Sequence, residues 1–171
     1  MFQGIRQRLH DMRTIRHLCQ GAESHARANG ERAPGAEHFL LASIDLPDGS
    51  ARRAFERVGA DPGALRAAIE QQYRDALQQI GIDAPLPPGA PAAAPARGVY
   101  RAQPSGDDVM QSLARSRKGQ PGPLLGAHVV ALVARLPQGV AARTLRAMQL
   151  DANALEAAAR AEAMASNGAP S

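Results

Sequence analysis

The stretch GAEHFLLASIDLPDGSARRAFERVGAD, residues 35–61, predicts two short helices and the start of a third. Apolar residues recur at helical spacing from 37 to 44 and from 51 to 58. Between them, Leu-Pro-Asp-Gly at 46–49 has the composition of a turn. A similar stretch, GAHVVALVARLPQGVAARTLRAMQLD, follows at 126–151. Neither stretch carries a catalytic signature, so the repetition itself is the feature to explain.

A shift of 90 residues aligns the two stretches without a gap from His38/His128 to Ala68/Ala158. Apart from four pairs of alanines, the identical pairs include His38/His128, Leu46/Leu136, Pro47/Pro137, Gly49/Gly139, Arg53/Arg143, Asp61/Asp151 and Leu65/Leu155. The matched Pro, Gly and Asp residues carry the most weight, because these residues fix turns and helix caps. We therefore predict two copies of a four-helix unit, packed as a pseudo-twofold pair. The first helices of the two copies match poorly.

The first helix is expected from about residue 5 to Ala28, where Asn29-Gly30 supplies a left-handed stop. Its apolar residues recur every three or four positions and are expected to form one face: Leu9, Met12, Ile15, Leu18, Cys19, Ala22 and Ala26. Arg6, Arg13 and Arg16 fall on the other side. Aromatic residues make up only 3% of the chain, which favours closely packed aliphatic helices over a sandwich.

The segment APLPPGAPAAAPARG, residues 84–98, is too rich in proline for regular structure and is interpreted as an exposed linker. After it, Ser105 and Asp108 resemble a capping box at the start of the second unit. We predict an all-α fold of eight helices. Its parts are a first repeat at 1–80, a Pro/Ala-rich linker at 81–104, a second, degenerate repeat at 105–165 and a flexible tail at 166–171.

These features resemble the N-terminal repeat domain family of the Clp unfoldases, over residues 1 to about 165. That family's motif is Gly-Thr-Glu-His followed by apolar residues, a turn containing glycine, and two further helices. The first copy reads Gly35-Ala36-Glu37-His38-Phe39-Leu40-Leu41, and Met1-Phe2 also looks like family members. The second copy keeps His128, Gly139-Val140-Ala141-Ala142-Arg143 and Leu150-Asp151.

The resemblance implies a non-catalytic protein-binding module, which recognises substrates, adaptors or regulators of a Clp-type chaperone/protease system. The family's ATPase ring is missing, because Lys118 is the only lysine and no GxxxxGK[ST] loop surrounds it. The chain is thus expected to be a stand-alone relative or a piece of a larger protein. Docking is expected between the repeats or near the first helix, with Phe2, Arg6 and Glu37 as contacts. The alternative for Phe2 is a place in the core.

Some family members bind phosphoarginine through the Thr-Glu pair of each repeat. In this chain Glu37 keeps the acid of the first copy, whereas Ala36 replaces the threonine. Gly126-Ala127 replaces both residues in the second copy. The favoured interpretation is that Glu37 suits the N-terminus of a helix, with phosphoarginine recognition as the less favoured alternative.

The remaining residues offer no reaction centre or metal site. His38 and His128 share one repeat position, which indicates a structural role such as a loop or cap hydrogen bond. His10 and His17 lie about 10 Å apart along a helix, too far to share a metal ion. No CxxC, HExxH or G-x-S-x-G motif occurs, so we predict no metal, no cofactor and no enzymatic activity.

The net charge is +4, and 19 of the 20 basic residues are arginine, since Lys118 is the only lysine. An Arg-rich helical protein that binds nucleic acid or regulates is therefore the alternative function. Phosphate contacts would come from Arg6, Arg8, Arg13, Arg16, Arg52, Arg53 and Arg57. Interspersed acids and the lack of aromatic stacking residues argue against nucleic acid. One cysteine, Cys19, and no long apolar run predict a cytoplasmic protein without membrane contact.

Overall fold

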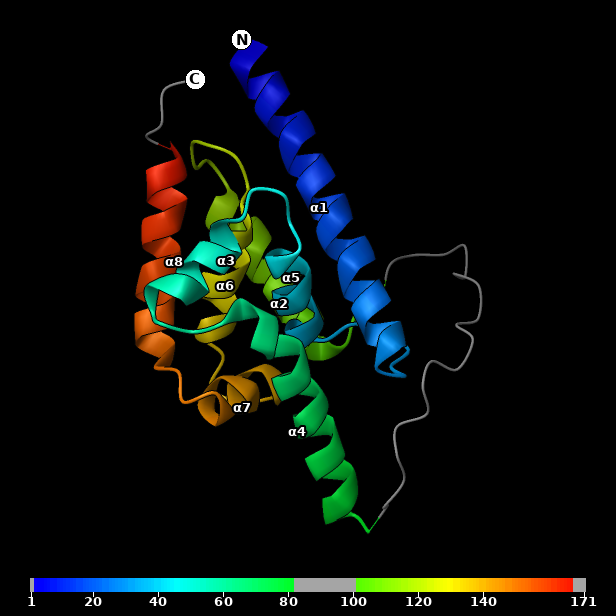
Figure 1. The fold of residues 1–171 in the computed structure, drawn as a ribbon. Helices are drawn as coiled ribbons and strands as arrows, with labels where there is room; N and C mark the ends of the chain where they lie inside the picture. The colour runs from blue at the N-terminus through cyan, green and yellow to red at the C-terminus, as the bar shows by residue number, and fades with distance from the viewer. Residues whose placement is uncertain (1, 82–100, 168–171) are drawn as a thin grey trace.

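Two short apolar helices, α2 (Ala36–Ile44) and α6 (Gly126–Ala134), pack against each other at the centre of the molecule (Figure 1). Every residue of α2 is buried. A Cβ atom at Gly126 would lie only 2.7 Å from the carbonyl oxygen of Ser43, so glycine permits this close approach. The computed structural model describes residues 2–81 and 101–167, with side chains at 4–81 and 101–166.

The third and fourth helices of each repeat pack against helices of the other repeat. The first repeat continues through α3 (Ser50–Arg57), a 3-10 turn (Pro62–Ala64) and α4 (Leu65–Gln79). The second continues through α7 (Val140–Ala147) and α8 (Ala152–Asn167). Helix α3 packs on α8, and α7 packs on α4. Each third helix thus lies against the fourth helix of the other repeat, which builds a single core.

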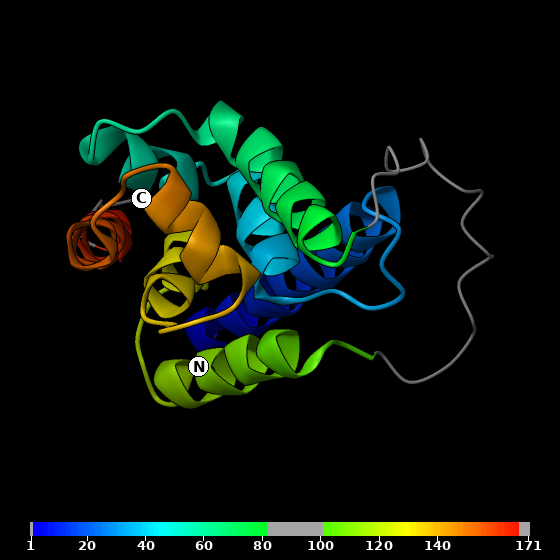
Figure 2. The same cartoon turned by 90° about the horizontal axis from the view of Figure 1, so that it is seen from below.

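The first helices of the repeats differ most. Helix α1 (Phe2–Ala28) has 27 residues and packs on α2, whereas α5 (Pro104–Arg117) has 14 residues and contacts both α2 and α6. Figure 2 shows α5 below α1 and beside α6. The C-terminal end of α4 extends beyond the body in Figure 1, while α8 packs along α6.

The bounds of α6 and α7 are those of α2 and α3 shifted by 90 residues. All eight α-helices of the described part are consistent with a double repeat, and this part contains no strand, so the all-α prediction is confirmed. The fully buried side chains come from both repeats, and the largest are Phe39, Phe55, Leu18, Leu40, Leu65, Ile69, Leu155, His38, Val109, Val129, Val130 and Val133.

The predicted capping box at the second unit is wrong. The N-cap lies two residues earlier than predicted, at Gln103, and helix α5 begins at Pro104. The Ser105 hydroxyl instead accepts a hydrogen bond from the backbone N–H of Ala36, at 3.2 Å. Residues 82–100 of the predicted 81–104 linker lie outside the described residues. Residues 168–171 of the predicted tail lie outside them as well.

Candidate functional site

A histidine caps the central helix of each repeat in the same way. His38 Nδ1 accepts a hydrogen bond from the Gly35 N–H at 2.9 Å, and His128 Nδ1 accepts one from the Leu125 N–H at 3.1 Å. Burial lowers the pKa of both rings; Glu37 partly opposes this at His38, and Arg117 reinforces it at His128. Each ring is thus kept neutral, as a hydrogen-bond acceptor for its own helix N-terminus.

The turns that follow are also matched. Gly49 and Gly139 precede α3 and α7 with φ angles of 65° and 103°, in the region that favours glycine. The Asp61 carboxylate accepts from the Gly63 N–H at 2.8 Å. The Asp151 carboxylate accepts from the backbone N–H two residues later, at 2.9 Å. The two glycines and the two aspartates thus fix the backbone at the turns, and their contacts serve the fold.

Three further N–H groups at the two central N-termini donate hydrogen bonds to side chains from elsewhere in the chain. Ser50 Oγ accepts from the Ala127 N–H at 2.9 Å, and Asp48 Oδ2 accepts from the Gly126 N–H at 3.2 Å. In the first repeat Ser105 covers Ala36, as described above. A helix N-terminus can bind a phosphate only with free N–H groups, and these groups already have partners.

Glu37 points into the protein. Its side chain is 3% exposed and accepts a hydrogen bond from the Tyr73 hydroxyl at 2.6 Å. The Tyr73 ring stacks on His38, with ring centroids 6.3 Å apart. Burial, together with the charge and hydrogen bond of Glu37, raises the pKa of Tyr73 well above its usual range. Tyr73 therefore stays a donor, and the Glu37 carboxylate joins α2 to α4 inside the fold.

Several arginines of α3 are engaged within the fold. Arg53 and Arg57 both donate to the buried carboxylate of Glu162 on α8. Burial raises the pKa of Glu162, but the hydrogen bonds and charges of the two arginines outweigh that effect and lower it overall. Arg52 donates to the carbonyl oxygen of Ile44 at 3.0 Å. The contacts of Arg53 and Arg57 join the two repeats, and all three contacts reduce the number of guanidinium groups free for phosphates.

The first half of α1 places polar side chains toward the protein. The Gln7 amide donates to the Gly122 carbonyl oxygen at 2.6 Å, and Asp11 accepts from the Leu124 N–H at 2.7 Å. Thr14 continues this line and is buried. The same line is mostly apolar in the second half, where its buried members are Leu18, Ala22 and Ala26 together with His25.

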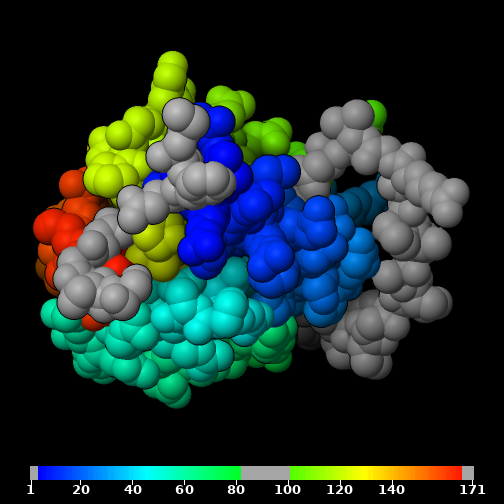
Figure 3. Space-filling view, turned by 90° about the horizontal axis from the view of Figure 1, so that it is seen from above, coloured from blue at the N-terminus to red at the C-terminus, as the bar shows by residue number. Residues whose placement is uncertain are grey.

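The large apolar side chains of that first half face solvent. We call these four residues the α1 stripe: Ile5, Leu9, Met12 and Ile15. Their exposed fractions are 56%, 57%, 65% and 39%. Spacings of three and four residues put them on one side of the helix, and Figure 3 shows this part of α1 at the surface.

One predicted helix face is therefore wrong in part. The sequence placed Leu9, Met12 and Ile15 on the same apolar face as Leu18, but they are exposed whereas Leu18 is fully buried. The reason is the polar line of Gln7 and Asp11, which binds the loop before α6 and turns the apolar side outward. The helical spacing of Gln7, Asp11 and Leu18, which puts all three on one side of α1, was the signal in the sequence for this orientation.

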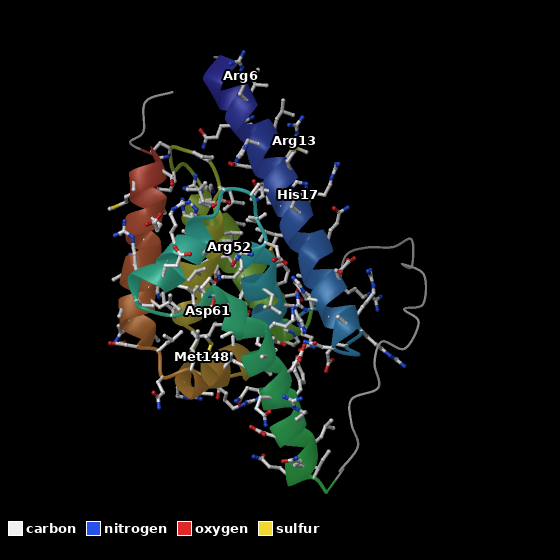
Figure 4. All side chains as sticks on the ribbon, in the orientation of Figure 1. Arg6, Arg13, His17, Arg52, Asp61 and Met148 are labelled. Carbon is white, nitrogen blue, oxygen red and sulfur yellow. The ribbon has the colours of Figure 1, made fainter. Side chains whose placement is uncertain are left out.

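Two of the three predicted ligand contacts, Arg6 and Glu37, are not brought together. Arg6 is exposed near the free end of α1 (Figure 4), whereas Glu37 is buried in the first turn of α2, after the other end of α1. The Phe2 side chain lies outside the described residues. A hollow lies between α5 and α6, within the second repeat, and includes Val109, Leu132 and Leu136 in its lining.

Comparison with known proteins assigns the family. The model of the family described as Clp repeat (R) N-terminal domain matches residues 13–108, more than half of the chain. A search of curated proteins found no match to the chain. Among the described residues, no helix is long and apolar enough to cross a membrane. Nor do three His, Cys, Asp or Glu side chains in that part gather as a metal site. The match spans α2 to α4, most of α1 and the start of α5, and the chain belongs to the Clp repeat N-terminal domain family.

Proposed function

We propose that this chain is a non-catalytic docking module that recognises substrates, adaptors or regulators of a Clp-type chaperone/protease system. Domains of its family are protein-interaction modules of Clp ATPases. The observation that carries the proposal in this chain is the α1 stripe, four large apolar side chains exposed together on one side of a helix. Contiguous exposed apolar surface of this kind marks protein interaction sites.

The α1 stripe is a better docking surface than the helix N-termini. Phosphoarginine would need the Glu37 carboxylate, which Tyr73 and burial hold inside the fold. It would also need free backbone N–H groups, and those of Ala36 and Ala127 are bonded to serine hydroxyls. We therefore propose protein surfaces, rather than phosphoarginine, as the partners.

The nucleic-acid alternative is less well supported. Of the seven arginines considered for phosphate contacts, Arg52, Arg53 and Arg57 already donate to groups within the fold. The other four, on α1, lie among exposed Ile, Leu and Met side chains. Such side chains offer nothing to a phosphate backbone, whereas they are common anchors in protein interfaces.

The test is affinity capture on the immobilised chain, after nuclease treatment, from cells of its source. The variant Ile5→Ser/Leu9→Ser/Met12→Ser replaces the three most exposed residues of the α1 stripe. The control Ile80→Ser/Met164→Ser removes two apolar side chains exposed elsewhere, at 69% and 66%. We expect the native chain and the control to enrich a Clp ATPase, its peptidase or proteins degraded by them, and the stripe variant to lose them.

Two results would contradict the proposed function. One is that no Clp component or Clp substrate is enriched over an empty matrix. The other is that, in a parallel capture without nuclease treatment, the material retained is nucleic acid, released by nuclease or by moderate salt, as electrostatic binding to phosphates requires.

A further inference from the structure

The charges around the α1 stripe indicate what chemistry would cover it. Arg8 lies four residues before Met12 and Arg16 four residues after it, so both arginines share the side of the helix that carries Met12. Arg6 and Arg13 lie along the flank and are exposed (Figure 4). The surface is therefore apolar and strongly cationic at once.

These four arginines have no hydrogen-bond or ion-pair partner among the described residues. Asp11 is the only acid between residues 4 and 16, and it faces the loop before α6. The first turn of α1 contains no acid either. Carboxylates supplied from outside the chain would thus find guanidinium groups that are free to donate bidentate hydrogen bonds to them.

The length and shape of the surface fit a helix. Ile5 to Arg16 spans about 17 Å along α1, or about three turns. A helix laid beside α1 presents side chains at the same three- and four-residue spacing, which is the usual way an amphipathic helix binds an apolar helical surface.

Resting on the proposed function, we propose that the α1 stripe binds an acidic amphipathic helix of the partner protein. The apolar side of that helix covers Ile5, Leu9 and Met12. Its Glu or Asp side chains pair with Arg8 and Arg16. Loss of either component weakens binding, because apolar burial supplies affinity and the charge pairs supply orientation and partner choice.

Two other occupants fit the surface less well. A second copy would bring its own Arg8 and Arg16 against those of the first, with no acid on either stripe to balance them. A membrane-surface helix keeps its cationic side chains on the face away from the acyl chains. Here Arg8 and Arg16 share the side of Met12, so burying Met12 in lipid would bury guanidinium groups with it.

The test measures binding of the full chain to a synthetic helical peptide with leucine at i, i+4, i+7 and i+11, flanked by glutamates. Matched peptides carry glutamine or lysine in place of every glutamate. We expect the acidic peptide to bind, the glutamine peptide to bind at least about tenfold more weakly, and added salt to reduce the difference. Leu9→Ser/Met12→Ser should weaken binding of the acidic peptide by about tenfold or more.

Charge reversal supplies the sharpest arm of this test. Arg8→Glu/Arg16→Glu should lose the acidic peptide and gain the lysine peptide, whereas the control Arg74→Glu/Arg146→Glu, at two exposed arginines elsewhere, should keep the native preference. Equal binding of the acidic and glutamine peptides, or no binding of either, overturns the inference. So does self-association through α1, or binding of phosphatidylserine vesicles that Leu9→Ser/Met12→Ser abolishes. If capture of Clp components survives removal of the stripe, this inference fails while membership in a Clp system stands.

Discussion

The two repeats have matching central helices, α2 and α6, but different first helices, α1 and α5. Helices α2 and α6 begin with the same histidine cap, lie in contact and supply the core. Helix α5 stops after 14 residues, whereas α1 runs for 27 and its first half leaves the core. The comparison indicates that the shared core constrains the central helices, while the first helix was free to differ and to carry the surface that we propose binds a partner.

The largest expected effect tests whether the repeats share one core. Leu40 and Val130 are equivalent positions on α2 and α6, and both are fully buried. Leu40→Ala should lower the free energy of unfolding by about 2–5 kcal/mol, and Val130→Ala by less, because it removes fewer carbons. Urea denaturation followed by circular dichroism should show one transition for each variant. Two separate transitions would mean that the repeats fold independently.

The next effect tests the asymmetry where α2 and α6 meet. Ala36 and Gly126 are equivalent positions, but only at Gly126 would a Cβ atom reach 2.7 Å from a backbone oxygen. Gly126→Ala should cost about 1–3 kcal/mol through overpacking. Ala36→Gly should cost about 0.5–1 kcal/mol through backbone entropy. Equal losses in thermal or urea unfolding would argue against the close approach of the helices.

The histidine caps predict a pH dependence common to both repeats. Burial lowers the pKa of His38 and His128 in the folded state, so below about pH 6.5 the unfolded chain binds more protons than the folded one. The free energy of unfolding should therefore fall as the pH drops from 7 to 5, by up to about 1.4 kcal/mol per pH unit for each histidine.

The matched variants His38→Gln and His128→Gln identify the source of that slope. Each should flatten the dependence of unfolding free energy on pH over the same range, and the double variant should flatten it most. A slope unchanged in the double variant would mean that the two histidine caps are not its source.

The smallest effect concerns the two halves of α1. Leu9→Ala should change the free energy of unfolding by no more than about 0.5 kcal/mol, because Leu9 is exposed. Leu18→Ala, in the same helix, should behave as a core truncation, as Leu40→Ala does. Similar losses at both positions would place Leu9 in the core and remove the docking surface.

The repeated turns and caps were readable from the sequence because each depends on a few adjacent residues. Asp61 and Asp151 accept from nearby N–H groups, and the bounds of α2 and α3 recur in α6 and α7. The all-α fold follows from these local signals together with the helical periodicity. The histidine cap also lies within one turn, between His38 and Gly35.

Contacts between distant segments could not be predicted in this way. Ser105 suits a cap of its own helix, yet its hydroxyl lies beside the N–H of Ala36 once α5 packs on α2. Likewise, the periodicity of α1 allows either side to face inward. The loop before α6 decides between them by bonding Gln7 and Asp11. The spacing of these two residues with Leu18 is consistent with that choice, but the pattern within α1 does not identify the distant loop that they contact.

The most direct test of the central claim measures solvent exposure along α1 in the native chain. Methyl NMR with a soluble paramagnetic agent should show strong relaxation at Ile5, Leu9, Met12 and Ile15 and almost none at Leu18. That result would establish an apolar surface held outward by polar contacts beneath it. Methyl groups of Leu9 and Met12 as protected as that of Leu18 would contradict the account, because α1 would then bury the side proposed to bind a partner.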